Sequence, residues 1–312
     1  MSARWMKSRL SVIVSMAIVL VLISHSVSNA GGAGSSACEF LNIGVGSRAV
    51  GMGGAYSAIT DDPSANYWNP AGLTNNESSA LMLQHNEHFQ DIQHEYIAYA
   101  APFGSRGVVG VSVSYLHMGT ILGYDANDVP TGEFKVYDIA YGLSYGHSIT
   151  ENLRIGCGTK YIQQSLSDLK ASGWAFDIGM LYSYRNFNTS LVAANFGTAV
   201  KYESEKFALP TEYRLGLGYS PYSSPLTLAA EYGYSKDGTE RMAFGAEYNL
   251  IEHFSLRSGF CPGEINNGDG KYSLGCGVEV WGQKIDYTFL PNTDLGSSHR
   301  ISATITFSEF NR

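Results

Sequence analysis

The sequence of 312 residues has little charge and, after its first thirty residues, no long apolar run. Charged residues make up 15% of the chain, which is less than a water-soluble domain usually carries. The absence of a further apolar run of membrane length argues against a bundle of transmembrane helices. The formal net charge of −8 argues against nucleic acid as a partner, because surfaces that bind nucleic acid are basic.

Cysteine is also scarce, with only Cys38, Cys157, Cys261 and Cys276. Export would permit disulfides, and four cysteines allow three sets of pairs, among which the sequence does not choose. Cys157 and Cys276 fall on the outward faces of the strands predicted below, so we expect them to be free. No spacing of the CxxC type occurs, and we predict no metal site.

The first thirty residues have the pattern of a secretory signal peptide. Arg4, Lys7 and Arg9 give a basic start, residues 10–23 form a short apolar run, and residues 28–30 offer small side chains for cleavage. An N-terminal membrane anchor is the alternative, but the apolar run is short for a transmembrane helix. We therefore predict that residues 1–30 are a signal peptide and that the protein is exported.

Residues 40–73 differ from everything that follows, because they are rich in glycine and alanine and contain two adjacent aspartates. Asp62 followed by Pro63 has the form of a helix N-cap with proline at the first helical position. That helix must end near Trp68, because Pro70 favours extended backbone in the residue before it. Residues 31–77 are therefore predicted to form a small folded plug.

From about residue 78 onward, large apolar residues alternate with small or polar ones, which is typical of β-strands. Between 136 and 146, tyrosine, isoleucine and leucine face one way, while aspartate, alanine, glycine and serine face the other. We predict about fourteen strands, over residues 79–89, 93–102, 106–118, 134–148, 152–166, 173–185, 189–199, 211–220, 225–235, 240–250, 254–262, 271–281, 283–290 and 299–307.

The two faces of these segments favour a membrane barrel over a soluble sandwich. One face is apolar with aromatic residues near the strand ends, whereas the other carries glycine, serine and isolated charges. Tight turns alternate with longer loops, as in outer-membrane barrels with both termini in the periplasm. We predict an all-β fold, a transmembrane antiparallel β-barrel of about 14 strands formed by residues 78–312, with the plug inside its lumen. The location would be the outer membrane of a Gram-negative-type bacterium.

Charged residues of both signs fall on the inward face of the predicted strands. We expect them to form a charge network that braces the barrel and its plug. The alternative is a polar path for translocation. The inward charges are Asp138, Arg154, Lys160, Asp177, Arg214, Glu231, Glu247, Arg257, Glu279 and Asp286.

No pattern in the chain supports a catalytic site. Residues 142–146 match the G-x-S-x-G pattern, but that motif needs a strand-turn-helix, and here it lies within a predicted strand. His85 and His88 point to opposite faces of a strand, so they do not share a metal without a bend. We predict a protein that is not an enzyme and has no cofactor.

Residues 40–73 resemble the N-terminal signature of the PorV/PorQ family, through residues 44–56, 61–65 and 68–73. Their aspartate and Asn-Pro-Ala-Gly part is also similar to the wider FadL/OMPP1 (UPF0164-like) group of fatty-acid and hydrocarbon transporters. The resemblance implies an outer-membrane barrel with an N-terminal plug, in which the motif residues define the fold. The plug motif consists of Asp61, Asp62, Pro63, Asn69, Pro70 and Gly72.

This resemblance leaves three functions open. PorV and PorQ act in type IX protein secretion, which would give secreted proteins or secretion-machinery components as partners, and this is the main hypothesis. FadL transports long-chain fatty acids or other hydrophobic compounds, which would make hydrophobic small molecules the partners. The third hypothesis is a structural barrel without transport. In each case the barrel would also contact outer-membrane lipid, and no nucleic acid is expected.

Overall fold

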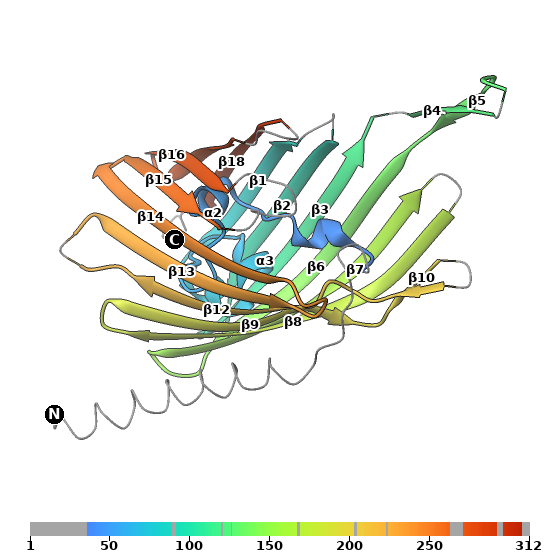
Figure 1. The fold of residues 1–312 in the computed structure, drawn as a ribbon. Helices are drawn as coiled ribbons and strands as arrows, with labels where there is room; N and C mark the ends of the chain where they lie inside the picture. The colour runs from blue at the N-terminus through green and yellow to red at the C-terminus, as the bar shows by residue number, and fades with distance from the viewer. Residues whose placement is uncertain are drawn as a thin grey trace.

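Fourteen antiparallel strands close into one barrel around a short N-terminal segment (Figure 1). The computed structural model describes residues 36–307 except 89–91, 120, 126, 167–168, 203–204, 223, 263–270 and 292–295. The barrel strands are β1 (Ser79–Glu87), β2 (Ile92–Phe103), β3 (Gly107–Met118), β6 (Val136–Ser148), β7 (Leu153–Leu166), β8 (Leu169–Tyr184), β9 (Phe187–Gly197), β12 (Glu212–Tyr219), β13 (Leu226–Ser235), β14 (Glu240–Ile251), β15 (Phe254–Phe260), β16 (Tyr272–Val280), β17 (Gln283–Leu290) and β18 (Ser298–Phe307).

The first and last barrel strands pair with each other, from Ser79 opposite Phe307 to Glu87 opposite His299. This pairing gives every strand a hydrogen-bonded neighbour on both sides, as a sheet in a bilayer requires. The predicted fold class is confirmed, and each of the fourteen predicted spans overlaps one barrel strand. None of the described helices is long and apolar enough to cross a membrane.

Two short hairpins were not predicted. β4 (Ile121–Tyr124) pairs with β5 (Pro130–Phe134), and β10 (Val200–Tyr202) pairs with β11 (Glu205–Phe207), both within connections that we expected to be loops. They lie at the end of the barrel opposite the tight turns, and the β4–β5 hairpin extends away from it in Figure 1. We call the two ends of the barrel the long-connection end and the short-turn end.

Side chains alternate between lipid and lumen as the pattern predicted. On β8, Trp174, Phe176 and Ile178 are exposed on the outside, whereas Ala175 and Asp177 between them are buried inside. The outward face of the barrel therefore forms an apolar band of exposed Leu, Ile, Val, Phe, Tyr and Trp side chains that suits contact with hydrocarbon. None of the four cysteines, which all lie among the described residues, forms a disulfide; Cys38 and Cys261 are buried and Cys157 is exposed.

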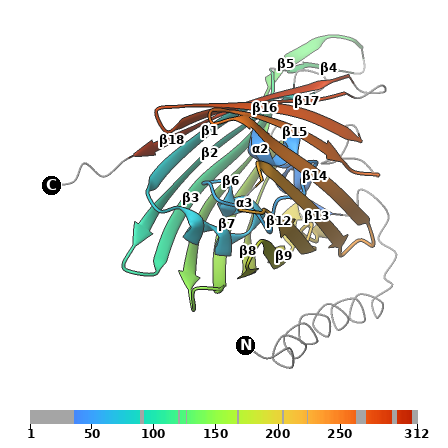
Figure 2. The ribbon, with the colours of Figure 1, turned by 90° about the vertical axis from the view of Figure 1, so that its left-hand side faces the viewer.

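The N-terminal segment lies inside the barrel, where strands surround its helices in Figure 2. Its elements are η1 (Glu39–Asn42), α2 (Ser47–Gly51), α3 (Ala65–Trp68) and η2 (Pro70–Asn75), of which the first and last are 3-10 helices. Its first described residue, Ser36, bridges to Ala208 at the long-connection end, whereas β1 begins at the short-turn end. The plug thus passes along the lumen before the barrel begins. The predicted signal peptide, residues 1–30, lies outside the described residues.

The helix predicted after Asp62 begins two residues later than expected. Asp62 accepts a hydrogen bond from the Ser64 N–H at 2.8 Å, and its carbonyl accepts one from Ala65, which forms a single turn before α3. The predicted end of this helix near Trp68 is confirmed. Asn69 is extended and caps a second short helix, η2, that the sequence analysis did not predict.

The apolar band predicts a strong penalty for charge in its middle. Leu143 is exposed near the centre of β6, so Leu143→Arg should lower the free energy of unfolding from lipid vesicles by about 2–4 kcal/mol. Glu151→Arg, in the exposed turn after β6, is the control and should change it by less than about 1 kcal/mol. Urea titration in vesicles measures both, and equal effects would contradict the assigned lipid face.

Candidate functional site

The Asn-Pro-Ala-Gly motif packs against the barrel wall and forms hydrogen bonds both to it and within the plug. The Asn69 Oδ1 accepts the N–H of Ala71 at 3.0 Å, and its Nδ2 donates to the carbonyl of Ser57 in the plug at 2.9 Å and of Met180 in β8 at 3.3 Å. One side chain therefore caps η2, ties the plug together and holds the plug to the wall.

Glycines allow the motif to approach the wall this closely. A Cβ atom on Gly156 in β7 would lie 2.3 Å from the Pro70 carbonyl carbon, and one on Gly179 in β8 would lie 2.1 Å from the Asn69 Oδ1. Within the plug, a Cβ on Gly72 would lie 1.8 Å from the Thr60 Oγ1 and 2.8 Å from its Cβ. The glycine of the motif thus serves packing, not an unusual backbone angle.

A chain of ion pairs, buried apart from the Asp61 carboxylate, links the plug to the wall near the short-turn end. Arg48 in α2 binds Glu247 of β14 with two hydrogen bonds, Nε to Oε2 at 2.7 Å and Nη2 to Oε1 at 2.9 Å, and also pairs with Asp61. Glu247 is shared with Arg257 of β15 at 2.6 Å, and Arg257 reaches Asp286 of β17 at 2.5 Å. Two charges of the plug and three of the wall therefore form one continuous network.

A polar cavity of about 360 Å³ borders this ion chain. Its lining includes Asp61 and the exposed turn residues Glu252 and His253, which places it at the short-turn end. In the same part of the plug, burial and the neighbouring Asp61 carboxylate raise the pKa of Asp62. The short-turn end of the lumen is therefore polar and charged.

A second group of charges holds the centre of the plug. Glu231 of β13 accepts the Ser57 N–H at 2.9 Å and the Arg241 Nη2 at 2.7 Å. Arg214 of β12 donates to the Tyr67 carbonyl at 3.2 Å, and its guanidinium lies 5.6 Å from the centroids of both the Tyr67 and Trp68 rings. These inward charges act on plug backbone and aromatic rings as well as on each other.

A third group lies where β9 departs from regular pairing. The register of β8 and β9 shifts between Phe176 and Ile178, and Asn195 has a left-handed φ of 57°. Asp177 accepts the Asn195 N–H at 2.8 Å, and Lys160 reaches both Asp177 at 2.8 Å and the Asn195 Oδ1 at 2.7 Å. The buried ion pair therefore stabilises a bulge in the wall.

Three predicted members of the network lie apart from these groups. Glu279 pairs with Lys284 at 3.7 Å, with both side chains 43% exposed. Arg154 donates to the Ser183 hydroxyl at 2.9 Å, and Asp138 is half-buried with a hydrogen bond to Gln164. The structure thus separates the inward charges into local groups, and their bracing role stays a prediction.

The long-connection end of the lumen contains an apolar cluster, beside buried polar side chains such as His94 and Arg300. We call this cluster of buried apolar residues the mouth cluster. It packs the start of the plug against β6, β7, β8 and the β10–β11 hairpin. Burial raises the pKa of the Cys38 thiol to about 12, and this thiol donates to the Gln164 Oε1 at 2.9 Å. The mouth cluster consists of Cys38, Phe40, Leu41, Ile43, Ala140, Ile162, Ala171, Ala175, Val200 and Leu209.

The histidines do not form a metal site among the described residues. His85 pairs with Glu95 at 2.6 Å on the outer face, whereas His94 is buried and bonds the Ser114 hydroxyl at 2.8 Å. Sequence reasoning missed Arg48 as the central plug cation, although it is the only basic residue between 31 and 77.

Close packing at Gly72 predicts a large effect of one methyl group. Gly72→Ala must displace Thr60 and should destabilise the folded barrel by about 1–3 kcal/mol. Gly119→Ala is the matched control, because a Cβ there meets no atom within 4 Å. The two variants are heated in detergent and run on a gel, on which folded and unfolded barrels migrate differently. The temperature at which the band of the folded barrel disappears measures the difference in stability. Equal temperatures for the two variants would contradict the packing of the motif.

Removal of the plug cation should loosen the plug. Arg48→Ala deletes charged hydrogen bonds to Glu247 and Asp61 and should weaken the plug–wall contact by about 3 kcal/mol. We expect frequent ion-conducting openings in planar bilayers. Arg154→Ala is the control, because it removes a lumen arginine that bonds Ser183 of the wall and not the plug. The barrel of this variant should show no such openings. Equal conductance of both variants would contradict a role of Arg48 in holding the plug.

The fold is similar to that of solved outer-membrane transporters. The toluene transporter TodX of P. putida has a TM-score of 0.60 at 13% identity, over 85% of this chain and 99% of that chain. The toluene transporter TbuX of Ralstonia pickettii has 0.58 at 14%, over 85% and 98%. A FadL homologue of Pseudomonas aeruginosa has 0.57 at 12%, over 81% and 96%. At these identities the likeness concerns the fold.

No curated protein matches the chain. A family model matches residues 12–173, just over half of the sequence, which include the whole plug and the strands from β1 to β7. By this match the chain belongs to the Uncharacterised protein family (UPF0164).

Proposed function

We propose that this outer-membrane barrel carries hydrophobic compounds across the membrane, with its N-terminal plug as the gate. The observation that carries the proposal is the mouth cluster. Phe40, Leu41 and Ile43 of the plug are buried there against Ile162 and Val200 of the wall and its hairpin, so a compound at the long-connection end contacts them once the plug moves. Such contacts favour an apolar compound and oppose a sugar or an ion, which would lose its hydration.

The contrast between the two ends of the lumen gives the path a direction. The mouth cluster is apolar, whereas the cavity at the short-turn end is bordered by the ion pairs of Arg48 and Arg257. We take the long-connection end as the outer face and the short-turn end, where the barrel begins and ends, as the periplasmic face. Apolar residues would then receive the compound outside, and displacement of the plug would release it inward.

The fold similarity to TodX, TbuX and the FadL homologue supports transport of this kind more than it supports secretion. The type IX secretion hypothesis rests on the likeness of residues 40–73 to PorV/PorQ and stays a second candidate. A structural barrel without transport is the third. The three make different predictions for bound molecules and for uptake.

The test compares two neighbouring residues of the plug. Leu41→Ser removes a buried apolar side chain of the mouth cluster and should lower the uptake of labelled toluene and oleate about tenfold or more. Asn42→Ser is the control, since the Asn42 side chain bonds Glu39 within the plug, and should leave uptake unchanged. Uptake is measured in cells that lack other channels for hydrophobic compounds and that contain equal amounts of each folded variant.

Uptake that does not depend on the protein at all would reject the transport proposal. In that event, mass spectrometry of the protein purified in mild detergent separates the remaining hypotheses. Secreted proteins that share a C-terminal domain would favour type IX secretion. A barrel without bound cargo would favour the structural role.

A further inference from the structure

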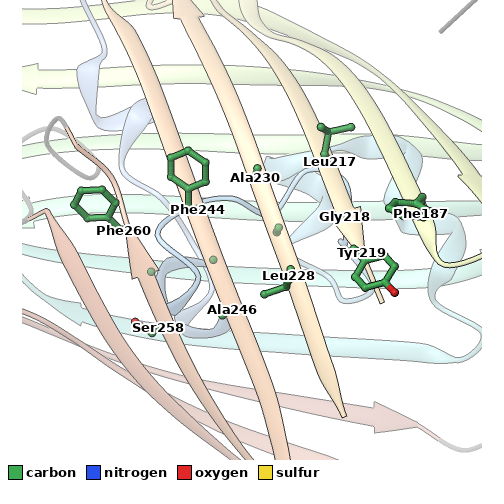
Figure 3. A pocket seen from close by; sticks show the side chains of 13 residues that line it. Phe187, Leu217, Gly218, Tyr219, Leu228, Ala230, Phe244, Ala246, Ser258 and Phe260 are labelled. Atoms are coloured by element: carbon green, nitrogen blue, oxygen red, sulfur yellow. The ribbon is translucent and has the colours of Figure 1, made fainter. Parts of the chain in front are cut away.

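A groove of about 560 Å³ opens on the outside of the barrel, across β12, β13, β14 and β15 (Figure 3). Its volume falls within the range of about 300–1,000 Å³ that is common for ligand sites. It is distinct from the lumen, because its walls are outward-facing side chains such as Leu217, Phe244 and Phe260, all exposed. Figure 3 shows these larger side chains around a floor of small ones.

The strand register explains why the groove is there. Ala230 lies between Leu217 and Phe244 across the sheet, and Ala246 lies between Leu228 and Ser258. Three adjacent strands therefore present Ala230, Ala246 and Ser258 side by side, at positions where most of the outer band carries large apolar side chains. The small residues form the floor, and the larger ones form the rim.

The wall behind the groove consists of backbone alone. A Cβ on Gly245 would lie 2.5 Å from the Met52 carbonyl oxygen, and one on Gly259 would lie 2.0 Å from the Gly53 nitrogen. The plug backbone therefore lies directly against the inner side of the same strands. The lumen is filled at this point, so whatever occupies the groove comes from the membrane side.

The groove has the chemistry of a hydrocarbon site. Its lining carries no charged side chain, and its side-chain polar groups are the hydroxyls of Tyr219 and Ser258. It is continuous with the apolar band that faces lipid, and hydrocarbon is the material in contact with that band. Protein interiors pack without large voids, so a depression of this size facing hydrocarbon is filled by it.

From these observations we infer that the groove is a binding site for one acyl chain of an outer-membrane lipid. The methyl-sized floor admits the chain close to the backbone, and Phe187, Phe244 and Phe260 enclose it at the rim. The bound chain lies one backbone layer from Met52 and Gly53 of the plug. It thus completes a thin part of the wall against which the plug rests. This site is independent of the proposed transport through the lumen.

The experiment uses the full folded barrel in phosphatidylethanolamine vesicles that contain a phosphatidylcholine with a photoactivatable diazirine on its acyl chain. After illumination, mass spectrometry maps the labelled residues. We expect labelling of the groove residues to exceed the average of the outer band by several-fold. An even distribution of label around the barrel would overturn the inference, whatever the variants show.

Filling the floor should remove this preference. Ala246→Leu combined with Ser258→Leu should reduce the labelling of β13–β15 to the average of the band. Ala303→Leu is the matched control, because it adds the same bulk to the outward face of β18, opposite Leu83 and Ile285. Ala230→Leu alone provides a milder second variant if the double variant does not fold. Unchanged labelling in a folded floor variant would also overturn the inference.

Discussion

The closing of β1 onto β18 is the constraint on which the rest of this structure depends. A strand in hydrocarbon must have both of its edges hydrogen-bonded. Nine residue pairs between β1 and β18 complete this bonding around the barrel. Closure fixes an inside and an outside, so each strand must alternate between a lipid face and a lumen face. The inside of a fourteen-stranded ring would be open to water, and here plug residues between Phe40 and Leu73 lie buried within it.

The plug depends on contacts with the wall, both apolar and polar, because its own elements are too short to be stable alone. α2 has five residues and α3 has four, far below the length at which an isolated helix forms in water. The wall bonds the plug backbone directly, through Glu231 at the Ser57 N–H and through the Thr288 hydroxyl at the Ser47 carbonyl at 2.6 Å. Buried ion pairs contribute little net stability compared with apolar packing, but they favour one position of the plug, which the proposed gate requires.

The barrel was largely predictable from the sequence, whereas the contacts between the plug and the wall were not. A period of two residues carries through the barrel strands apart from bulges such as the one in β9, so residues such as Trp174 and Asp177 could be assigned to opposite faces. Partners across the lumen have no such periodic signal. Arg48 and Glu247 are 199 positions apart, and only the three-dimensional path of the plug brings them together. The contact of Gly72 with Thr60 was likewise hidden, because sequence alone does not distinguish a glycine needed for packing from one needed for its backbone angle.

The central claim is that the plugged lumen admits hydrophobic compounds and excludes polar ones. The most direct measurement is the rate at which vesicles containing the purified barrel take up a labelled hydrophobic compound and a sugar of similar size, each compared with empty vesicles. We predict that the barrel accelerates entry of the hydrophobic compound and leaves entry of the sugar unchanged. Acceleration of both, or of the sugar alone, would show an open polar pore and would contradict the claim.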